Sequence, residues 1–192
     1  MIDARLISAL PFWLSLVFVP LLALGAGLGG WWLVLTPLYS FGLISALDMV
    51  AGLNATNEDP ETPVEPLVWY RLITLLWLPV QVLVIFGALW WVANHDALSG
   101  FETLVLFYTI GIATGGVGIV YAHELMHQKS TAERWLADLL MASVLYSHFR
   151  SEHLRVHHLW VGTPRDPVSA RYNEGFWRYF ARVLVACPRS AW

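Results

Sequence analysis

Residues 101–127 read FETLVLFYTIGIATGGVGIVYAHELMH, an apolar stretch that runs without a break into two histidines. A helix of about 20 apolar residues is long enough to cross the hydrocarbon core of a bilayer. We therefore predict a membrane-spanning helix from about Phe101 to Tyr121, followed directly by a polar segment that holds His123 and His127. Ionisable residues at membrane depth are costly and usually functional, so this junction is the first candidate site.

The composition of the whole chain agrees with a membrane protein. Of its 192 residues, 57% are hydrophobic and 13% are charged, and the mean hydropathy is +0.57. A typical soluble domain has about 25% charged residues. The net charge of −3 gives no indication of nucleic-acid binding. The single cysteine, Cys187, excludes an internal disulfide and a multi-cysteine zinc site, and we interpret it as an unpaired thiol at the membrane interface.

Three further apolar stretches precede residues 101–127, and short turns or polar loops separate them. The stretch nearest the N-terminus is too long for a cleaved signal peptide and has no clear basic region before it, so we keep it in the mature protein. The sequence predicts an all-α integral membrane fold with about four transmembrane helices in two hairpins, followed by cytoplasmic-side helices that bear histidines. We expect one membrane domain over 1–192, with the four helices in 1–121 and the histidine region in 122–192. The predicted helices and connections are Ile7–Leu28, Gly29-Gly30, Trp31–Val50, the acidic loop Asn54–Pro66, Leu67–Ala93, Asn94–Ser99 and Phe101–Tyr121.

The distribution of basic residues predicts the orientation. All eleven Lys and Arg residues fall on the side that holds the N-terminus, the acidic loop and everything after Tyr121. Basic residues are retained in the cytoplasm, so we expect that side to be cytoplasmic. Beyond residue 122, the stretch Ala132–Tyr146 is too short to span the bilayer and is expected to lie at the interface or to re-enter the membrane. A second apolar stretch, Phe176–Cys187, is interrupted by arginines.

Six of the seven histidines lie between residues 123 and 158. His123 and His127 are four residues apart, so on an α-helix both imidazoles point from one face and can reach one metal ion. The same spacing predicts a shared face for His153 and His157. His158 is then turned by about 100°, toward a second metal or another coordination position. Neutral imidazole suits iron, copper, zinc and nickel, so the sequence predicts a metal site.

Two kinds of metal chemistry fit this pattern. The segment His123-Glu124-Leu125-Met126-His127 has the form of a zinc protease motif, in which a glutamate between two histidines acts as general base. Intramembrane zinc proteases carry such a motif on a membrane helix, but they have no use for the second histidine group. A histidine-rich iron site that activates dioxygen accounts for both groups.

The histidine segment resembles the membrane alkane 1-monooxygenases, or alkane omega-hydroxylases, within the membrane fatty acid desaturase and hydroxylase superfamily. The resemblance is strongest over the last third of the chain, and the upstream stretch from Asp48 to Glu65 also looks like that family. The matching segments are His123-Glu124-Leu125-Met126-His127, His148-Phe149, Glu152-His153-Leu154-Arg155-Val156-His157-His158, Gly162-Thr163-Pro164-Arg165-Asp166-Pro167 and Arg171.

The resemblance implies a pair of non-haem irons, dioxygen as oxidant, rubredoxin as electron donor and terminal hydroxylation of a medium-chain n-alkane. It also implies a location in the bacterial inner membrane. It implies no catalytic residues other than the metal ligands. A fatty acid desaturase or hydroxylase acting on an acyl lipid is the alternative with the same metal chemistry. By the match of the boxes, the iron ligands are His123, His127, His153, His157 and His158. Residues that can hydrogen-bond to these ligands are Glu124, His148, Glu152 and Asp48.

The chain departs from the family pattern at its end. The family has a further histidine in an Asn-Tyr-x-Glu-His stretch and a final His-x-x-His-His box, and the sequence stops at Trp192 before either. Val156 and Gln128 stand where the family commonly has glycine and a basic residue, respectively. Because five imidazoles cannot satisfy two irons, we expect this sequence to be the N-terminal part of a longer protein and to be inactive alone.

An alkane substrate has no polar group to recognise, so we expect it to reach the site from the lipid, between the helices. Lining residues are expected on the second and fourth helices. Small residues on the fourth helix either let helices pack closely or leave room for the substrate, and we favour close packing. These residues are Gly111, Gly115, Gly116 and Gly118. His95, on the opposite side, is interpreted as a solvated loop residue.

Overall fold

The computed structural model describes residues 4–52 and 67–192, so the predicted acidic loop Asn54–Pro66 lies outside the described residues. All regular structure in the described parts is helical. The chain divides into two compact units, Met1–Leu125 and Met126–Trp192, which are described separately.

The first unit contains the membrane-spanning helices. Four helices are long and apolar enough to cross a bilayer, and each extends a predicted stretch by a few residues or shifts it by one. The prediction of an all-α membrane fold with four spans is therefore confirmed. The clearest difference is the fourth span, which continues for five residues beyond the predicted Tyr121. The observed spans are Leu6–Leu28, Gly30–Ala51, Val68–Asn94 and Gly100–Met126.

Three of the four spans are broken into segments of different helical pitch, and α5 (Val68–Asn94) is the exception. The first span contains α1 (Ala4–Trp13), a 3-10 turn (Leu14–Val17) and α2 (Phe18–Leu28). The second contains a 3-10 turn (Gly30–Val34), α3 (Leu35–Pro37), a π-helical segment (Leu38–Leu43) and α4 (Ile44–Ala51). The fourth contains α6 (Gly100–Ala113), a π-helical segment (Thr114–Gly118) and α7 (Ile119–Met126).

The fourth span is longer than the hydrocarbon core of a bilayer is thick. Its 27 residues extend about 40 Å at 1.5 Å per residue, whereas the hydrocarbon core is about 30 Å thick. At the opposite end, Ser99 and Glu102 form a capping box that satisfies the first backbone N–H groups of α6. Glu102 also accepts a hydrogen bond from the N–H of Gly30, 2.8 Å away, so it ties the two short turns at that end together.

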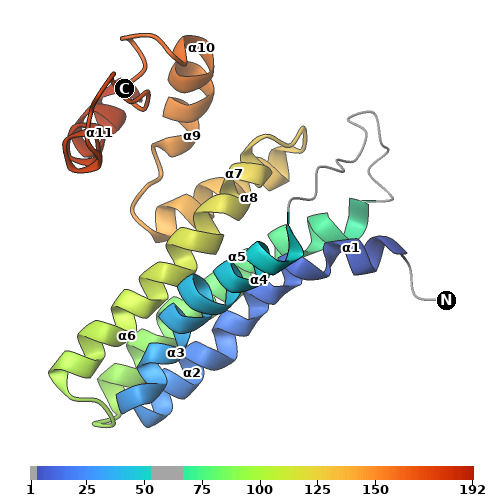
Figure 1. Ribbon diagram of the computed structural model, residues 1–192, viewed down its shortest axis with the longest axis vertical. Helices are drawn as coiled ribbons and strands as arrows, with labels where there is room; N and C mark the ends of the chain where they lie inside the picture. The colour runs from blue at the N-terminus through green and yellow to red at the C-terminus, as the bar shows by residue number, and fades with distance from the viewer. Residues whose placement is uncertain (1–3, 53–66) are drawn as a thin grey trace. The chain divides into compact units, whose positions relative to one another are not determined.

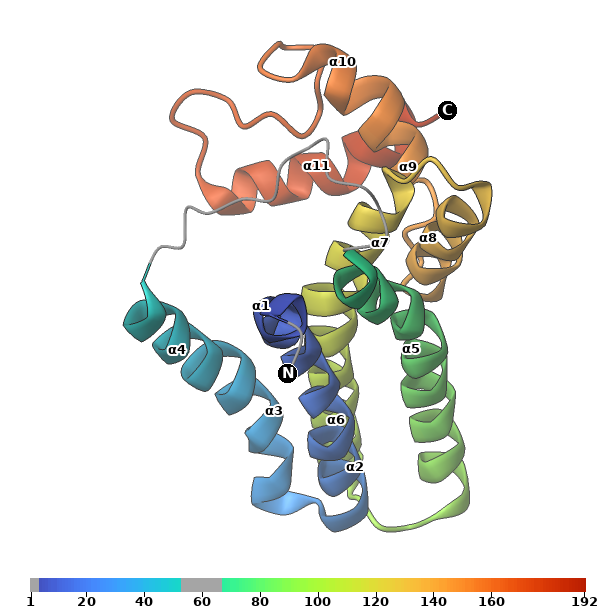
Figure 2. The same ribbon diagram turned by 90° about the vertical axis from the view of Figure 1, so that its right-hand side faces the viewer.

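The core of the first unit lies where the first, second and fourth spans meet. Phe18, Leu22, Leu33 and Leu106 are buried there, and the ring of Phe18 meets Tyr39 edge-on. In Figure 2 the first, third and fourth spans run alongside one another, whereas α4 leans away from them. Consistent with that position, α4 has no buried residue.

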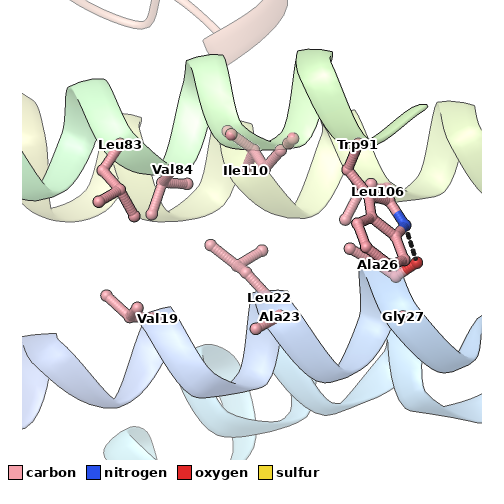
Figure 3. Close-up of a pocket in the computed structure, with 12 residues that line it drawn as sticks. Val19, Leu22, Ala23, Ala26, Gly27, Leu83, Val84, Trp91, Leu106 and Ile110 are labelled. Carbon is pink, nitrogen blue, oxygen red and sulfur yellow. Dashed lines mark hydrogen bonds between the residues drawn. The ribbon is translucent and has the colours of Figure 1, made fainter. Parts of the chain in front are cut away.

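An apolar cavity of about 280 Å³ lies between α2, α5 and α6 (Figure 3). Small residues on α2 and α5 create it, and the indole of Trp91 closes one end by donating a hydrogen bond to the carbonyl of Ala26, at 2.8 Å. A Cβ atom added at Gly87, in the wall, would meet nothing within 4 Å. The cavity is therefore open at Gly87 and is not filled there by neighbouring side chains.

The sequence favours close helix packing as the role of the glycines on the fourth span. The structure supports this role for only one of them. This glycine is Gly118, because a Cβ there would collide with the side chain of Gln81 on α5. Gln81 is buried and accepts a hydrogen bond from the indole of Trp77. At Gly111, Gly115 and Gly116 an added Cβ would meet nothing within 4 Å.

The second unit is a set of shorter helices (Figure 1). They are α8 (Thr131–Ser143), α9 (Phe149–Glu152), a π-helical segment (His153–His157), α10 (His158–Trp160) and α11 (Phe176–Ser190). Arg150 of α9 pairs with Asp138 of α8 through two hydrogen bonds of 2.6 and 2.7 Å. Cys187 is a free cysteine, as predicted, and its position at the membrane interface stays a prediction. It is fully buried in α11, and the Tyr146 hydroxyl donates to its sulfur at 3.5 Å.

Candidate metal centre

The second histidine group lies on a π-helical turn, which changes the faces predicted from α-helical spacing. Residues 153–157 form i→i+5 hydrogen bonds, so the turn is wider than an α-helical one. As a result, His158 faces His153, with 3.0 Å between their Nε2 atoms. The prediction that His158 is turned away from His153 is therefore wrong, and the widened turn is the physical reason. The ring of His157 remains stacked beside that of His153, with centroids 5.4 Å apart.

Three imidazoles meet within the second unit. The Nε2 atom of His153 lies 3.2 Å from that of His127 and 3.0 Å from that of His158. The rings of His127 and His158 are stacked, with centroids 5.0 Å apart. His153 is buried, whereas His127 and His158 are exposed.

This geometry fits the coordination of a metal ion. Two imidazole nitrogens that bind one ion at about 2.0–2.1 Å, at angles between tetrahedral and octahedral, are about 3 Å apart. The observed separations of 3.0 and 3.2 Å agree with that value. Neutral imidazoles with converging ring nitrogens have the donor set that iron, copper and zinc prefer.

His123 lies on α7, one helical turn before His127, as the sequence spacing predicts. The metal-binding nitrogens of these two residues lie within 4.8 Å of each other. Glu124 is exposed, and its carboxylate lies 3.6 Å from Nδ1 of His123. A carboxylate in that position can fix the orientation of a ligand imidazole.

His157 has a carboxylate partner that the sequence analysis did not identify. Its Nδ1 atom lies 2.9 Å from Oδ2 of Asp166, whose side chain is fully buried. Burial alone raises the pKa of Asp166, but hydrogen bonds from Ser169, His157 and Val168 outweigh it and leave the pKa below its usual value. The Thr-Pro-Arg-Asp-Pro segment was noted as a motif, yet spacing alone does not show that its aspartate reaches back to the histidines.

Two predicted neighbours of the ligands, Glu152 and His148, hold unsatisfied buried atoms. Glu152 is fully buried, and neither carboxyl oxygen makes a hydrogen bond of normal geometry among the described residues. The thiol of Cys187, a weak donor, lies beside it, and burial raises the Glu152 pKa. The Nε2 atom of His148 is likewise buried without a partner, and burial lowers the pKa of this imidazole. Such orphaned groups are rare in native structures and accumulate at functional sites.

The two remaining residues considered in the sequence, Asp48 and His95, lie in the first unit. Asp48 is near the end of α4, where its side chain is exposed, so its predicted hydrogen bond to a ligand remains a prediction. His95 is exposed in the turn after α5, as predicted, and its ring stacks on Trp91 with centroids 3.8 Å apart.

Comparison with known proteins shows two similarities. A family model described as fatty acid desaturase matches residues 99–192, the segment that carries all the histidine groups above. Over this segment the chain is similar to the fatty acid desaturase family.

The chain is also similar to alkane 1-monooxygenases. It is 34% identical to alkane 1-monooxygenase of Pseudomonas putida over 79% of this chain and 38% of that protein. It is 33% identical to alkane 1-monooxygenase 1 of Alcanivorax borkumensis, over 85% of this chain and 41% of that protein. The alkane 1-monooxygenase 2 of the same organism is 30% identical over the whole chain and 52% of its own length. The chain thus spans roughly two fifths to one half of these relatives.

Proposed function

We propose that the chain is the histidine-bearing membrane portion of a non-haem di-iron monooxygenase that hydroxylates the terminal methyl of medium-chain n-alkanes. The convergence of His127, His153 and His158 at 3.0–3.2 Å is the observation that carries this proposal. The chemistry that bound iron supplies is the activation of dioxygen, with one oxygen atom ending in the alcohol and the other in water. Rubredoxin would deliver the two electrons that this balance requires.

In this proposal His123, His127, His153, His157 and His158 hold iron. The second histidine group distinguishes the site from that of a zinc protease, which binds its metal through the first group and needs the intervening glutamate beside the metal-bound water. Glu124 instead lies against its neighbour His123 and is largely exposed.

A second apolar cavity, also of about 280 Å³, offers a place for the hydrocarbon. It lies between the first, second and fourth spans, with Phe12, Ile44, Gly116 and Val120 in its wall. Val120 is three residues before His123 on α7, so both lie on the same helix face. A hydrocarbon in this cavity would therefore end beside the helix face that carries His123. This placement agrees with the expectation of lining residues on the second and fourth helices.

We further propose that the histidines face the cytoplasm of a bacterium, with the spans in its inner membrane. Nine of the eleven basic residues follow Met126, which favours the cytoplasmic side for the second unit. A soluble electron carrier such as rubredoxin would reach the iron from that side, while alkane and lipid remain in the bilayer.

The test compares the full-length protein with its His153→Ala and His95→Ala variants. Cells expressing each protein receive octane, and 1-octanol is measured by gas chromatography, together with iron and zinc per purified chain. The wild type and His95→Ala are expected to bind iron and to make 1-octanol. His153→Ala is expected to lose both, because its imidazole contacts both neighbours in the converging group.

Two outcomes would contradict the proposal. If the wild type binds zinc alone and converts no hydrocarbon, the site belongs to a zinc enzyme. If the wild type desaturates or hydroxylates an acyl lipid supplied in place of octane and leaves octane unchanged, the substrate class is wrong although the metal chemistry stands.

A further inference from the structure

Asp166 occupies a distinctive position beside the histidine group. It lies in the loop between α10 and α11, and its side chain has no exposed surface. A buried carboxylate is costly unless hydrogen bonds compensate it. All the donors that compensate Asp166 can be named, and one of them is the imidazole of His157.

The two oxygens of Asp166 accept three hydrogen bonds. Oδ2 accepts from the hydroxyl of Ser169 at 2.6 Å and faces Nδ1 of His157 at 2.9 Å. Oδ1 accepts from the backbone N–H of Val168 at 3.0 Å. The carboxylate is therefore fixed on both sides, and it cannot rotate without breaking two of these bonds.

This arrangement determines which nitrogen of His157 is available to a metal. An ionised carboxylate only accepts hydrogen bonds, so the proton of a neutral His157 must be on Nδ1. The lone pair then resides on Nε2. Carboxylate–histidine–metal arrangements of this kind orient the ring and increase the basicity of the ligand nitrogen.

Helix α11 holds the loop that carries Asp166. Arg182 donates to the carbonyls of Pro167 and Ser169, in the segment that directly follows Asp166. The guanidinium of Arg182 also forms a bidentate ion pair with Glu174, at 2.6 and 2.8 Å. The position of Asp166 is thus set by a helix distant in sequence from the histidines.

We propose that Asp166 is a positioning residue that holds His157 with its proton on Nδ1 and its Nε2 available to the metal. The inference rests on the proposed function, because it takes His157 as a ligand. It assigns a role to the Thr-Pro-Arg-Asp-Pro segment and, through Arg182 and Glu174, to α11.

The test measures Co²⁺ binding by the full-length, metal-free protein, using the visible absorption of the bound ion. Asparagine keeps the shape of Asp166 but offers one acceptor oxygen to three donors. Asp166→Asn is expected to weaken Co²⁺ binding about 10–100-fold, the usual effect of removing such a partner, and to change the absorption spectrum. Asp138→Asn is the matched control, because Asp138 is a carboxylate of the same unit that pairs with Arg150 instead of a histidine. This control is expected to bind Co²⁺ as the wild type does.

Ser169→Ala gives an independent test if Asp166→Asn fails to fold. It removes one of the three hydrogen bonds and is expected to weaken Co²⁺ binding by a smaller factor than Asp166→Asn. Wild-type affinity and spectrum in Asp166→Asn would overturn the inference, as would equal losses of affinity in Asp166→Asn and Asp138→Asn. Absence of metal binding by the wild-type protein would instead count against the proposed function.

Discussion

At the residue scale, burial and hydrogen bonding distinguish histidines that are chemically identical in the sequence. His95 stacks on a tryptophan in an exposed turn, whereas His127 and His158 each direct a ring nitrogen at His153. His157 is set apart again by its buried carboxylate partner. Glu152 is fully buried and makes no normal hydrogen bond among the described residues. Burying a polar group in this way costs free energy of folding.

The ion pair between Glu174 and Arg182 predicts how the second unit responds to acid. Arg182 lowers the pKa of Glu174 to about 2, below its usual value of about 4.3. The pair therefore stabilises the fold fully above about pH 4.3, and this contribution disappears as the pH falls toward 2. Thermal unfolding of Glu174→Gln in detergent should consequently depend less on pH than that of the wild type between pH 4.3 and 2. An Asp96→Asn variant, altered at an exposed carboxylate, serves as control, and equal slopes for Glu174→Gln and wild type would contradict the prediction.

At the scale of helices, changes of pitch position the site. The π-helical turn at His153–His157 brings His158 onto the face of His153, and another π-helical segment, Thr114–Gly118, precedes the helix that carries His123. Such π-helical insertions are frequent at functional sites. The fourth span is also longer than the hydrocarbon core is thick.

The two apolar cavities of the first unit allow a matched test of where the hydrocarbon lies. Both have about 280 Å³, and each has a glycine in its wall where a Cβ meets nothing within 4 Å: Gly116 in one and Gly87 in the other. Gly116→Val is expected to shift hydroxylation toward shorter alkanes, because the added methyl groups occupy the cavity beside the His123 face. Gly87→Val should leave the chain-length profile unchanged, because Ile110 in that cavity is about 20 Å from His123 along the helix. The profile is measured by feeding hexane to hexadecane and quantifying the alcohols. A shift caused by Gly87→Val alone would assign the hydrocarbon to the other cavity.

At the scale of the whole molecule, four spans and a strongly asymmetric distribution of basic residues support the proposed orientation. An even number of spans returns the chain after α7 to the side on which it began. The turn at His95 and the turn at Gly29 then lie on the opposite side, where the sequence has no Lys or Arg.

Labelling with a membrane-impermeant maleimide tests this orientation. In a Cys187→Ala background, His95→Cys should react in intact cells and Gln128→Cys should react only after the membrane is permeabilised. Both positions are exposed, so a difference between them reports the membrane side and not burial. The reverse pattern would show that the histidines face the exterior, which would also exclude a cytoplasmic rubredoxin.

The sequence by itself determined the membrane class and the four spans, and it predicted the histidines of the candidate metal centre. Hydropathy over about 20 residues is a local property, and the histidine boxes are local spacings, so both can be read without coordinates. Only the tertiary structure decided which imidazoles meet, because the wider π-helical turn at His153–His157 is not evident from residue spacing. It also decided that Asp166 reaches His157 and that Cys187 is buried against Tyr146, since both contacts depend on how loops and α11 fold back on α9. Contacts between segments far apart in sequence leave no local pattern in the sequence. A helix that crosses a membrane does leave one, as a continuous apolar stretch.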